Sequence, residues 1–266
     1  MDQDSVTVVI PVYNEEECIQ KVVTDWSGEI TKHNIRYQIL VINDGSTDQT
    51  GKILDELQST KNELLVIHQK NQGHGAAVKN GYIQAINQNC NYIFQTDSDD
   101  QFTPKDFLAL WDMRKSSPAV FGHRKNRFDP THRKVISFFL RKFIASLFNV
   151  NIPDANIPYR LFEKSFLSHL LATLTPGLFA PNVFLSILSF KSLGNCAVLP
   201  VSHFERKGTE AKLIRWGLIK ACFKSFKDVV TFSYQINKKL SYIRDSQKVI
   251  ELHRSVKTQD SKPLAA

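Results

Sequence analysis

Two aspartates stand two positions apart directly after a short apolar segment. Residues Tyr92 to Gln95 read as a buried strand, and residues 96–101, Thr-Asp-Ser-Asp-Asp-Gln, follow it. Carboxylates at Asp97 and Asp99, with the Gln101 carbonyl, form a set of hard oxygen ligands. Such a set suits Mg²⁺ or Mn²⁺, which fills its remaining positions with water and substrate phosphate. We therefore predict a divalent metal and diphosphate site at this strand end.

Turn formation is the alternative explanation for this acidic segment. Asp and Ser side chains hydrogen-bond to neighbouring backbone groups in turns, and Pro104 follows the segment closely. Taken alone, residues 96–101 fit an Asx-rich turn as well as they fit a metal site. The rest of the chain must decide between the two interpretations.

Apolar, β-branched runs recur through the first 122 residues and alternate with helix-length segments. Near-continuous apolar strands separated by helices are typical of an α/β protein. Helices cover both faces of its parallel sheet, and ligands bind at the carboxyl ends of the strands. The predicted strands are Val6–Val12, Ile39–Ile42, Leu64–His68, Tyr92–Thr96 and Ala119–Gly122.

Polar residues follow these predicted strands at the point where each one ends. Residues 13–17, Tyr-Asn-Glu-Glu-Glu, come after the first strand, and residues 43–46, Asn-Asp-Gly-Ser, come after the second. Because parallel strands end at the same edge of a sheet, these residues and the 96–101 segment should face one crevice. Considered singly, the 43–46 segment also fits a turn before an N-capped helix.

Length and cysteine usage favour one large intracellular domain. A chain of 266 residues can bury a substantial core, and a single α/β domain with an appended arm fits that length. The four cysteines lie far apart and include no Cys-x-x-Cys pair, so we expect reduced thiols rather than disulfides or a zinc site. The N-terminal residues lack the pattern of a secretory signal, so we expect a cytoplasmic protein.

Charge divides the chain into two unlike parts. Residues 1–113 contain 8 Lys and Arg against 17 Asp and Glu, whereas residues 114–266 contain 26 against 9. The formal net charge of +8 therefore hides a strongly basic second part. Such a region could face nucleic acid, anionic lipid headgroups or a phosphorylated substrate, and charge alone does not choose among them.

The clearest element of the basic part is a helix predicted over Thr131–Phe148. Phe139, Phe143 and Leu147 recur every four residues in it, a spacing typical of core packing. Residues 170–190 then carry no charge over 21 residues, which is long enough for a membrane span. Because two prolines and a glycine interrupt this stretch, we expect two short segments around a turn instead.

A second amphipathic pattern covers Leu213–Phe232, where apolar residues lie on one face and lysines on the other. Such a helix would lie in a membrane interface, or it would pack on the domain with a solvated basic face. Both interpretations stay open. From Asp245 onward the sequence is polar, and we expect a flexible tail.

Taken together, the strand-end motifs resemble those of glycosyltransferase family 2, which has the GT-A fold. They are residues 10–16, Ile-Pro-Val-Tyr-Asn-Glu-Glu, residues 42–48, Ile-Asn-Asp-Gly-Ser-Thr-Asp, and residues 97–101. Within that family the chain is most similar to the dolichol-phosphate mannose synthase group of polyprenyl-phosphate sugar transferases. Further similarity to that group covers residues 122–124, 133–137, 154–161 and 206–212.

The resemblance implies an α/β fold with a mostly parallel sheet flanked by helices and a Rossmann-like nucleotide-binding half. We expect a GT-A catalytic domain over residues 1–210, a basic amphipathic helical extension over 211–244 and a polar tail over 245–266. The bacterial relatives often carry paired C-terminal membrane spans, which this sequence does not show. A lipid substrate would therefore have to be reached from the cytosol.

The resemblance also implies which residues bind each substrate. The nucleotide sugar would contact Pro11, Tyr13, Glu15, Ile42, Asp44, Asp97, Ser98 and Arg124. The metal, Mg²⁺ or Mn²⁺, would be held by Asp97, Asp99 and Gln101. The acceptor phosphate would contact Arg133, Ser137, Arg206 and Lys212, and the catalytic residues would be Asp99, Asp154 and Arg206.

Residue chemistry agrees with these implied roles. A Tyr ring offers a stacking face to a nucleobase, a carboxylate accepts its N–H groups, and guanidinium groups bind phosphate through paired hydrogen bonds. Each cation taken singly would also fit an exposed surface position. Residues 70–75 resemble the glycine-containing stretch that follows the third strand in the family, and we interpret His74 there as a surface residue.

Asp154 bears on the nature of the acceptor. An anionic phosphate can attack the anomeric carbon unaided, whereas a sugar hydroxyl needs a general base, for which Asp154 is the candidate. Asp154 also fits a turn after Pro153. The polyprenyl-phosphate group usually has a small residue, Gly and an aromatic residue nearby, whereas this chain has Asn-Ile-Pro-Tyr at 156–159, so both acceptors stay open.

The first hypothesis is a metal-dependent inverting glycosyltransferase. It would move a hexose from a GDP- or UDP-sugar to a polyprenyl (dolichyl or undecaprenyl) phosphate, bound peripherally to an anionic membrane surface on its cytosolic face. The second is a soluble family 2 enzyme that glycosylates a hydroxyl of a surface polysaccharide or another glycan. The third is a nucleic-acid-binding or lipid-binding protein on a degenerate scaffold, although we expect no nucleic-acid partner.

Overall fold

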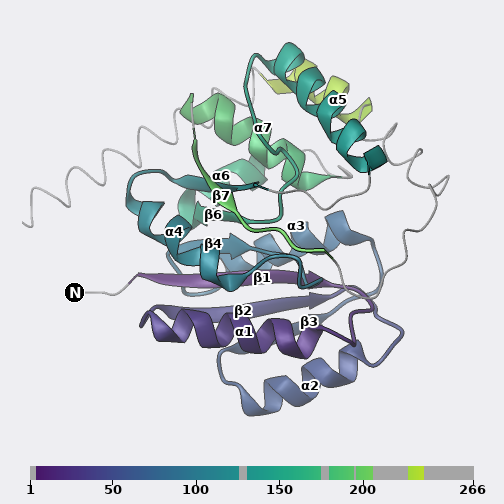
Figure 1. Cartoon of the computed structure of the whole chain (residues 1–266), viewed down its shortest axis with the longest axis vertical. Coiled ribbons are helices and arrows are strands. Elements are labelled where there is room, and N and C mark those ends of the chain that lie inside the picture. Colours follow the sequence, from purple (N-terminus) through teal and green to yellow (C-terminus); the bar gives the residue numbers. More distant parts are fainter. Residues whose placement is uncertain (1–3, 126–130, 175–179, 195, 206–226, 237–266) are drawn as a thin grey trace, which may run out of the picture.

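The computed structural model describes residues 4–125, 131–174, 180–194, 196–205 and 227–236 (Figure 1). Within these residues, seven strands form one sheet in the order β3-β2-β1-β4-β6-β5-β7. The first four strands pair in parallel, β6 is antiparallel to β4 and β5, and β7 is parallel to β5. The predicted α/β class with a mostly parallel sheet is confirmed. The strands are β1 (Ser5–Val12), β2 (Arg36–Asn43), β3 (Leu64–His68), β4 (Tyr92–Gln95), β5 (Ala119–Arg124), β6 (Arg160–Glu163) and β7 (Ala197–Val201).

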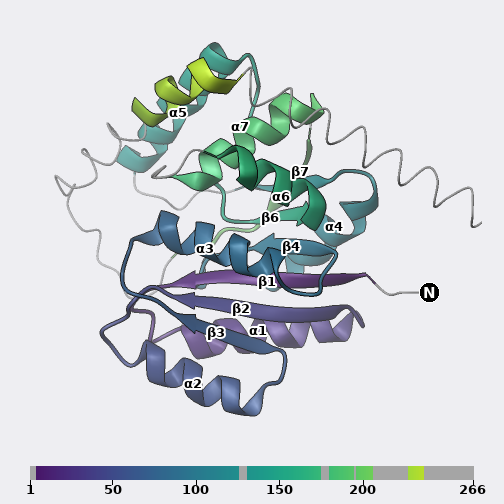
Figure 2. The ribbon, with the colours of Figure 1, turned by 180° about the vertical axis from the view of Figure 1, so that it is seen from behind.

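Helices cover both faces of the sheet. The face seen in Figure 1 carries α1 (Ile19–Lys32), α2 (Thr50–Thr60) and α4 (Phe107–Asp112), which share one apolar core with the strands. The opposite face, seen in Figure 2, carries α3 (His74–Ile86), α6 (Lys164–Thr173) and α7 (Pro181–Leu193) over a second core. Both figures show α5 (Thr131–Phe148) beside a helical segment at residues 227–236, outside α7.

Sequence pattern explains how the central strands and helices form. Every side chain of β1 is buried, as expected for a parallel strand covered on both faces. The first helix buries Ile19, Val22, Val23, Trp26 and Ile30, which lie on one stripe at helical spacing. The burial of this stripe packs α1 on the sheet, where the Trp26 ring lies 5.2 Å from the Phe94 ring of β4 between centroids.

The uncharged stretch 170–190 divides as predicted. Helix α6 ends at Thr173 and α7 begins with Pro181 at its first position, where a proline's missing N–H has no intrahelical partner to lose. Within the described residues, no helix combines the length and the apolar character needed to cross a membrane.

The predicted packing of α5 needs a correction. The helix itself spans the expected residues, but Phe139 is 62% exposed and Leu147 is 39% exposed. Ile144 and Phe148, on the adjacent stripe, are the buried residues. Phe143, the third residue of the predicted stripe, is partly buried and packs against the core. Because α5 packs against α7 and the 227–236 segment, the adjacent stripe is buried more deeply than the predicted one.

The C-terminal boundaries at 210 and 244 stay predictions. Of residues 211–266, the structure describes only 227–236, which are helical. Val229, Phe232 and Ile236 are buried there, and the Phe232 ring lies 5.0 Å from that of Phe184 between centroids. Most of the predicted amphipathic helix over Leu213–Phe232 lies outside the described residues.

Candidate active site

The carboxyl ends of β1, β2 and β4 meet at a cavity of about 400 Å³. The loop after β3 and the start of α3 complete its wall with Asn71, Gly73, His74 and Ala77. The sequence therefore identified the crevice from strand ends alone. Seven residues predicted to bind the nucleotide sugar or the metal line it: Pro11, Tyr13, Glu15, Asp44, Asp97, Ser98 and Asp99.

The loop after β1 is fastened to the loop after β2. Asn14 has a φ of 53°, and its Oδ1 accepts a hydrogen bond from the backbone N–H of Thr47 at 2.8 Å. Its own N–H donates to Ser46 Oγ at 3.0 Å, and the N–H of Glu15 donates to Thr50 Oγ1 at 2.9 Å. These bonds hold Tyr13, whose ring is about half exposed, at the rim of the cavity.

Asp44 organises the loop after β3. Its carboxylate is buried and accepts from Gln69 Nε2 at 2.7 Å, from the N–H of Gln72 at 2.9 Å and from the N–H of Gly73 at 2.8 Å. Gly73 has a φ of +90°, a conformation that side-chain-bearing residues rarely adopt. Asp44 thus sets the backbone that begins α3, and its contact with a nucleobase remains a prediction.

Asp97 and Asp99 stand on the floor of the cavity. Asp97 Oδ1 accepts from Gln95 Nε2 at 3.2 Å and lies 3.8 Å from His74 Nε2, while Asp99 Oδ1 accepts from the Gln101 N–H at 3.3 Å. Burial raises the pKa of Asp97 to about 6, with His74 opposing this shift and the neighbouring Asp99 charge adding to it. The negative charges of two adjacent, partly buried carboxylates repel each other, and a bound cation would relieve this repulsion.

The residues present fit a divalent cation that takes only two ligands from the protein and the rest from substrate phosphate and water. Within the described ranges, no cluster of three or more His, Cys, Asp and Glu side chains has the arrangement of a metal centre. Two carboxylates are nevertheless the donor set that Mg²⁺ or Mn²⁺ uses when phosphate oxygens and water supply the other ligands. Asp97 and Asp99 would hold such an ion.

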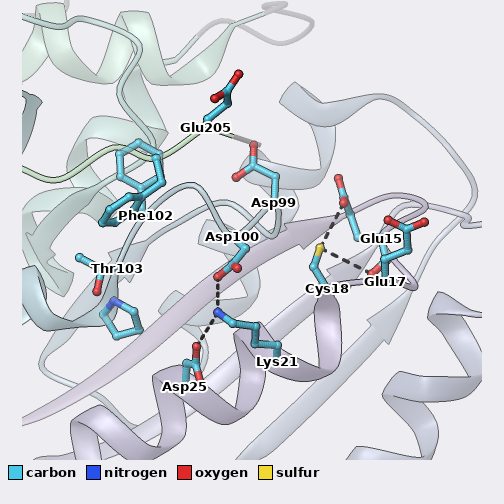
Figure 3. A pocket seen from close by; sticks show the side chains of 12 residues that line it. Glu15, Glu17, Cys18, Lys21, Asp25, Asp99, Asp100, Phe102, Thr103 and Glu205 are labelled. Carbon is cyan, nitrogen blue, oxygen red and sulfur yellow. Dashed lines mark hydrogen bonds and ion pairs between the residues drawn. The ribbon is translucent and has the colours of Figure 1, made fainter. Parts of the chain in front are cut away.

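A second cavity, of about 440 Å³, adjoins the first and shares Glu15 and Asp99 with it (Figure 3). Its lining is strongly acidic, and Lys21 reaches from α1 to Asp25 and Asp100, each at 2.8 Å. The ion pairs of Lys21 hold the turn that follows Asp99.

Cys18 lies at the boundary between these two cavities. Its thiol donates to Ser98 O at 3.2 Å and contacts Glu15 Oε2 at 3.3 Å. The thiol therefore joins the first turn of α1 to the loops that follow β1 and β4.

A third cavity, of about 700 Å³, opens between the first turns of α3 and α7. It shares Gly73 and His74 with the 400 Å³ cavity, and Asn156 and Asn182 form part of its wall. The space beside the paired carboxylates therefore continues toward the 154–161 segment, which the sequence assigned to the acceptor side.

Among the described residues that were predicted to bind the donor or metal or to act in catalysis, four do not line the 400 Å³ cavity. The Ile42 side chain is buried in the core. Gln101 accepts from the N–H of Phe204 at 2.9 Å through its backbone carbonyl, and its side-chain amide donates to Phe204 O at 3.0 Å. Arg124 instead pairs with Asp154, Nε to Oδ2 at 2.7 Å and Nη2 to Oδ1 at 2.9 Å.

The predicted acceptor residues fall largely outside the described part of the chain. Arg206 and Lys212 lie beyond it, and so does the side chain of Arg133, whose backbone belongs to α5. Ser137 lies on the same helix and is partly exposed. The acceptor-phosphate cluster thus remains a prediction from the sequence.

His74 is the cavity residue that the sequence interpretation missed. It was interpreted as a surface residue, which agrees with its 61% exposed side chain, but its place in the cavity wall beside Asp97 was not predicted. The available signal was its position at the start of a helix after the third strand. Ligands of parallel sheets meet such helix starts.

Comparison with known sequences identifies the family signature. The sequence profile described as Glycosyl transferase family 2 matches residues 7–171, which is more than half of the chain. An uncharacterized protein of Methanocaldococcus jannaschii is 35% identical over 136 residues, covering 49% of this chain and 57% of that protein. The undecaprenyl-phosphate 4-deoxy-4-formamido-L-arabinose transferase of Pseudomonas fluorescens is 26% identical over 221 residues, covering 82% of this chain and 63% of that protein. The chain thus spans less than two thirds of the length of these relatives.

Solved structures show the same fold at low sequence identity. Glucosyl-3-phosphoglycerate synthase from Mycobacterium tuberculosis, crystallised with Mn²⁺ and UDP-glucose, superposes with a TM-score of 0.64 at 16% identity, covering 86% of this chain and 79% of that one. Mannosyl-3-phosphoglycerate synthase from Rubrobacter xylanophilus gives 0.65 at 12% identity, covering 88% and 75%. The predicted GT-A architecture is confirmed.

Proposed function

The chain belongs to glycosyl transferase family 2, and we propose that it transfers a hexose from a nucleotide diphosphate sugar to a polyprenyl phosphate. The observation that carries the donor part is the 400 Å³ cavity, in which three strand ends bring an exposed Tyr13 ring to one side and Asp97 and Asp99 to the other. A base and a diphosphate need these two surfaces, one aromatic and one able to hold a cation.

We assign the sugar diphosphate to the carboxylate side of the cavity. A bound Mg²⁺ or Mn²⁺ would neutralise the charge that develops on the leaving diphosphate, without any proton transfer. Asp97 and Asp99 would hold that ion, and Tyr13 would stack on the nucleobase. GDP- and UDP-sugars remain alternative donors, because both have a stacking base and the same diphosphate.

The Arg124 and Asp154 pair supports a phosphate acceptor over a hydroxyl. Both carboxylate oxygens of Asp154 accept hydrogen bonds from Arg124, so the guanidinium competes for the lone pairs that a general base would use. An acceptor phosphate needs no such base. The relative from Pseudomonas fluorescens is named for transfer to undecaprenyl phosphate, which agrees with this choice.

Helix α5 supports contact with an anionic membrane. Exposed apolar side chains lie together over residues 135–139 of this helix: Val135, Ile136, Phe138 and Phe139. Cations lie close to this patch, with Arg141 at 5.8 Å and Lys142 at 5.9 Å from the Phe138 ring centroid. An apolar stripe flanked by cations is the pattern of a helix that lies in a lipid interface, where a polyprenyl phosphate would be found. We place the enzyme on the cytosolic face, since nucleotide sugars are made in the cytosol.

Donor binding can be tested before the acceptor is known. Thermal shifts with a panel of GDP- and UDP-sugars in the presence of Mn²⁺ should single out one nucleotide, because a ligand that binds only the folded state raises its unfolding temperature. The shift should vanish with EDTA and in Asp99→Ala. If no nucleotide sugar in the panel raises the unfolding temperature of the wild-type protein, the proposed donor is contradicted.

A further inference from the structure

The buried side-chain amide of Gln95 donates a hydrogen bond to Asp97. Gln95, the last residue of β4, is fully buried, and its Nε2 donates to Asp97 Oδ1 at 3.2 Å. Its Oε1 accepts from Asn182 Nδ2 at 3.1 Å and from the Tyr82 hydroxyl at 3.3 Å. Burial raises the pKa of Tyr82 well above its usual range, so this hydroxyl remains a donor.

The orientation of the Gln95 amide follows from these partners. An ionised carboxylate only accepts hydrogen bonds, so the amide nitrogen must face Asp97. The reverse orientation would set the amide oxygen against the carboxylate and the amide nitrogen against the Asn182 N–H₂ group. Both of these contacts are unfavourable, because Gln95 and Asn182 are buried and water cannot take the place of the lost partners.

Asn182 is in turn fixed by a buried arginine. Arg160 is fully buried, and its Nη1 donates to Asn182 O at 2.8 Å and to Ser186 Oγ at 3.3 Å. Its Nε donates to Ile157 O at 2.8 Å. Within the described residues, Arg160 has no carboxylate at ion-pair distance, so carbonyl and hydroxyl oxygens satisfy its charge. A buried cation of this kind is costly to displace.

One network thus connects two cavities. Asn182 forms part of the wall of the 700 Å³ cavity, and Asp97 lines the 400 Å³ cavity. Arg160 also binds the 155–157 turn, which belongs to the segment assigned to the acceptor side. The hydrogen bonds therefore run from the acceptor-side turn through α7 to the carboxylate.

We infer that Gln95 is a positioning residue that sets the rotamer of Asp97, so that the carboxylate presents Oδ2 to the divalent cation. Among the described residues, the hydrogen bond from Gln95 and the closest approach of His74 both go to Oδ1. This role rests on the proposed function, because the cation is part of it. Groups that hydrogen-bond to metal ligands typically change metal affinity or activity by about 10- to 100-fold when they are replaced.

The test is Mn²⁺ binding measured by electron paramagnetic resonance, with UDP or GDP present and no acceptor. Gln95→Met keeps the length of the side chain and removes its hydrogen bonds. Thr96→Val is the matched control, because Thr96 is equally buried and adjacent, and its Oγ1 has no hydrogen-bond partner in the described part of the chain. We expect the Mn²⁺ dissociation constant to rise about tenfold or more in Gln95→Met and to stay within about twofold in Thr96→Val.

If Gln95→Met only damaged the fold, its transfer rate would stay low even at saturating Mn²⁺. In a transfer assay, Gln95→Met should need more Mn²⁺ for half-maximal rate and should recover much of its rate at saturating Mn²⁺. If Gln95→Met does not fold, Asn182→Ala replaces it, because this change removes the donor to Gln95 Oε1 and keeps the backbone carbonyl that Arg160 binds. We expect a weakening of Mn²⁺ binding by several-fold in that variant.

Two negative results have separate meanings. Wild-type affinity for Mn²⁺ in Gln95→Met, or in Asn182→Ala where that variant is used, would overturn the positioning role and leave the proposed function intact. A wild-type protein that binds no Mn²⁺ with either nucleotide would remove the cation from the proposed function, and the positioning role would fall with it.

Discussion

Arg124 donates hydrogen bonds to both carboxylate oxygens of Asp154, with Nε 2.7 Å from Oδ2 and Nη2 2.9 Å from Oδ1. The two side chains are only 11% and 7% exposed. A two-point pair of this kind is rigid and strongly directional. The pair therefore fixes the 154–161 segment to the end of β5, and it engages both oxygens of the carboxylate that was predicted to serve as the base for a hydroxyl acceptor.

We expect Asp154→Asn to keep most of its transfer activity with a lipid phosphate. The amide still accepts one hydrogen bond from Arg124, so the rate should fall by less than about tenfold, with a lower unfolding temperature from the weakened buried pair. Loss of a general base would instead cost about 10²-fold or more. Initial rates and thermal unfolding, measured together, separate the two cases. A hundredfold loss of rate at an unchanged unfolding temperature would favour the hydroxyl acceptor.

Asp99 and its neighbour Asp100 should differ sharply on substitution. Asp99→Ala should abolish metal-dependent transfer, because one of two cation ligands is removed. Asp100→Asn is the matched control: Asp100 pairs with Lys21 and has a φ of 56°, a conformation that Asn tolerates. We expect the control to retain its rate within about threefold, since exposed ion pairs contribute little stability. Full activity in Asp99→Ala would exclude this residue from the reaction.

The pKa of Asp97 predicts a pH-dependent cost in the metal-free protein. Its folded value of about 6 lies above the ordinary value of 3.8, so the folded state binds more protons than the unfolded state between these values. The stability contributed by this group is therefore present below pH 3.8 and is lost as the pH rises to about 6.

Asp97→Asn should remove that dependence, because an amide does not titrate. With EDTA present, the variant should unfold at a higher temperature than the wild type above pH 6, and the difference should shrink toward pH 4. Mn²⁺ with nucleotide should stabilise the wild type and leave the variant unchanged. Parallel unfolding curves at every pH would show that Asp97 titrates normally.

Sequence pattern predicted five of the seven strands and missed two. The runs in β1, β3 and β4 are continuous, and each was found within one residue of its bounds. Strands β6 and β7 were missed because β6 begins with a buried charge at Arg160 and β7 contains a proline at Pro200. Such residues are tolerated only by particular tertiary contacts, here the carbonyls around the guanidinium.

The residues of the candidate active site likewise fall into those that the sequence predicted and those that it did not. Strand-end position identified Asp97, Asp99 and Asp44, because parallel topology alone brings those ends together. Gln95 carried no comparable signal, since an amide at the end of an apolar strand gains its meaning only from Asn182, which lies 87 positions away in the chain. Residues that support a site through long-range hydrogen bonds are therefore the part that local pattern does not reveal.

The exposed face of α5 should govern membrane binding. Combined replacement of Phe138 and Phe139 by serine should lower flotation with anionic vesicles by about tenfold or more, because each ring would otherwise bury apolar area in the interface. Rates with a water-soluble, short-chain phosphate acceptor should change little. Zwitterionic vesicles and high salt serve as controls for the contribution of the cations. Equal flotation of the variant and the wild type would place the lipid contact elsewhere.

Transfer itself is the most direct measurement. Purified protein should be incubated with labelled GDP- and UDP-sugars, a polyprenyl phosphate and Mn²⁺, and the lipid fraction should be analysed for the glycosylated product. We predict that one nucleotide sugar yields a labelled lipid phosphate ester, that EDTA and Asp99→Ala abolish it, and that Asp100→Asn does not. Labelled product on glycan hydroxyls alone, with none on the lipid across the whole panel, would contradict a polyprenyl-phosphate acceptor.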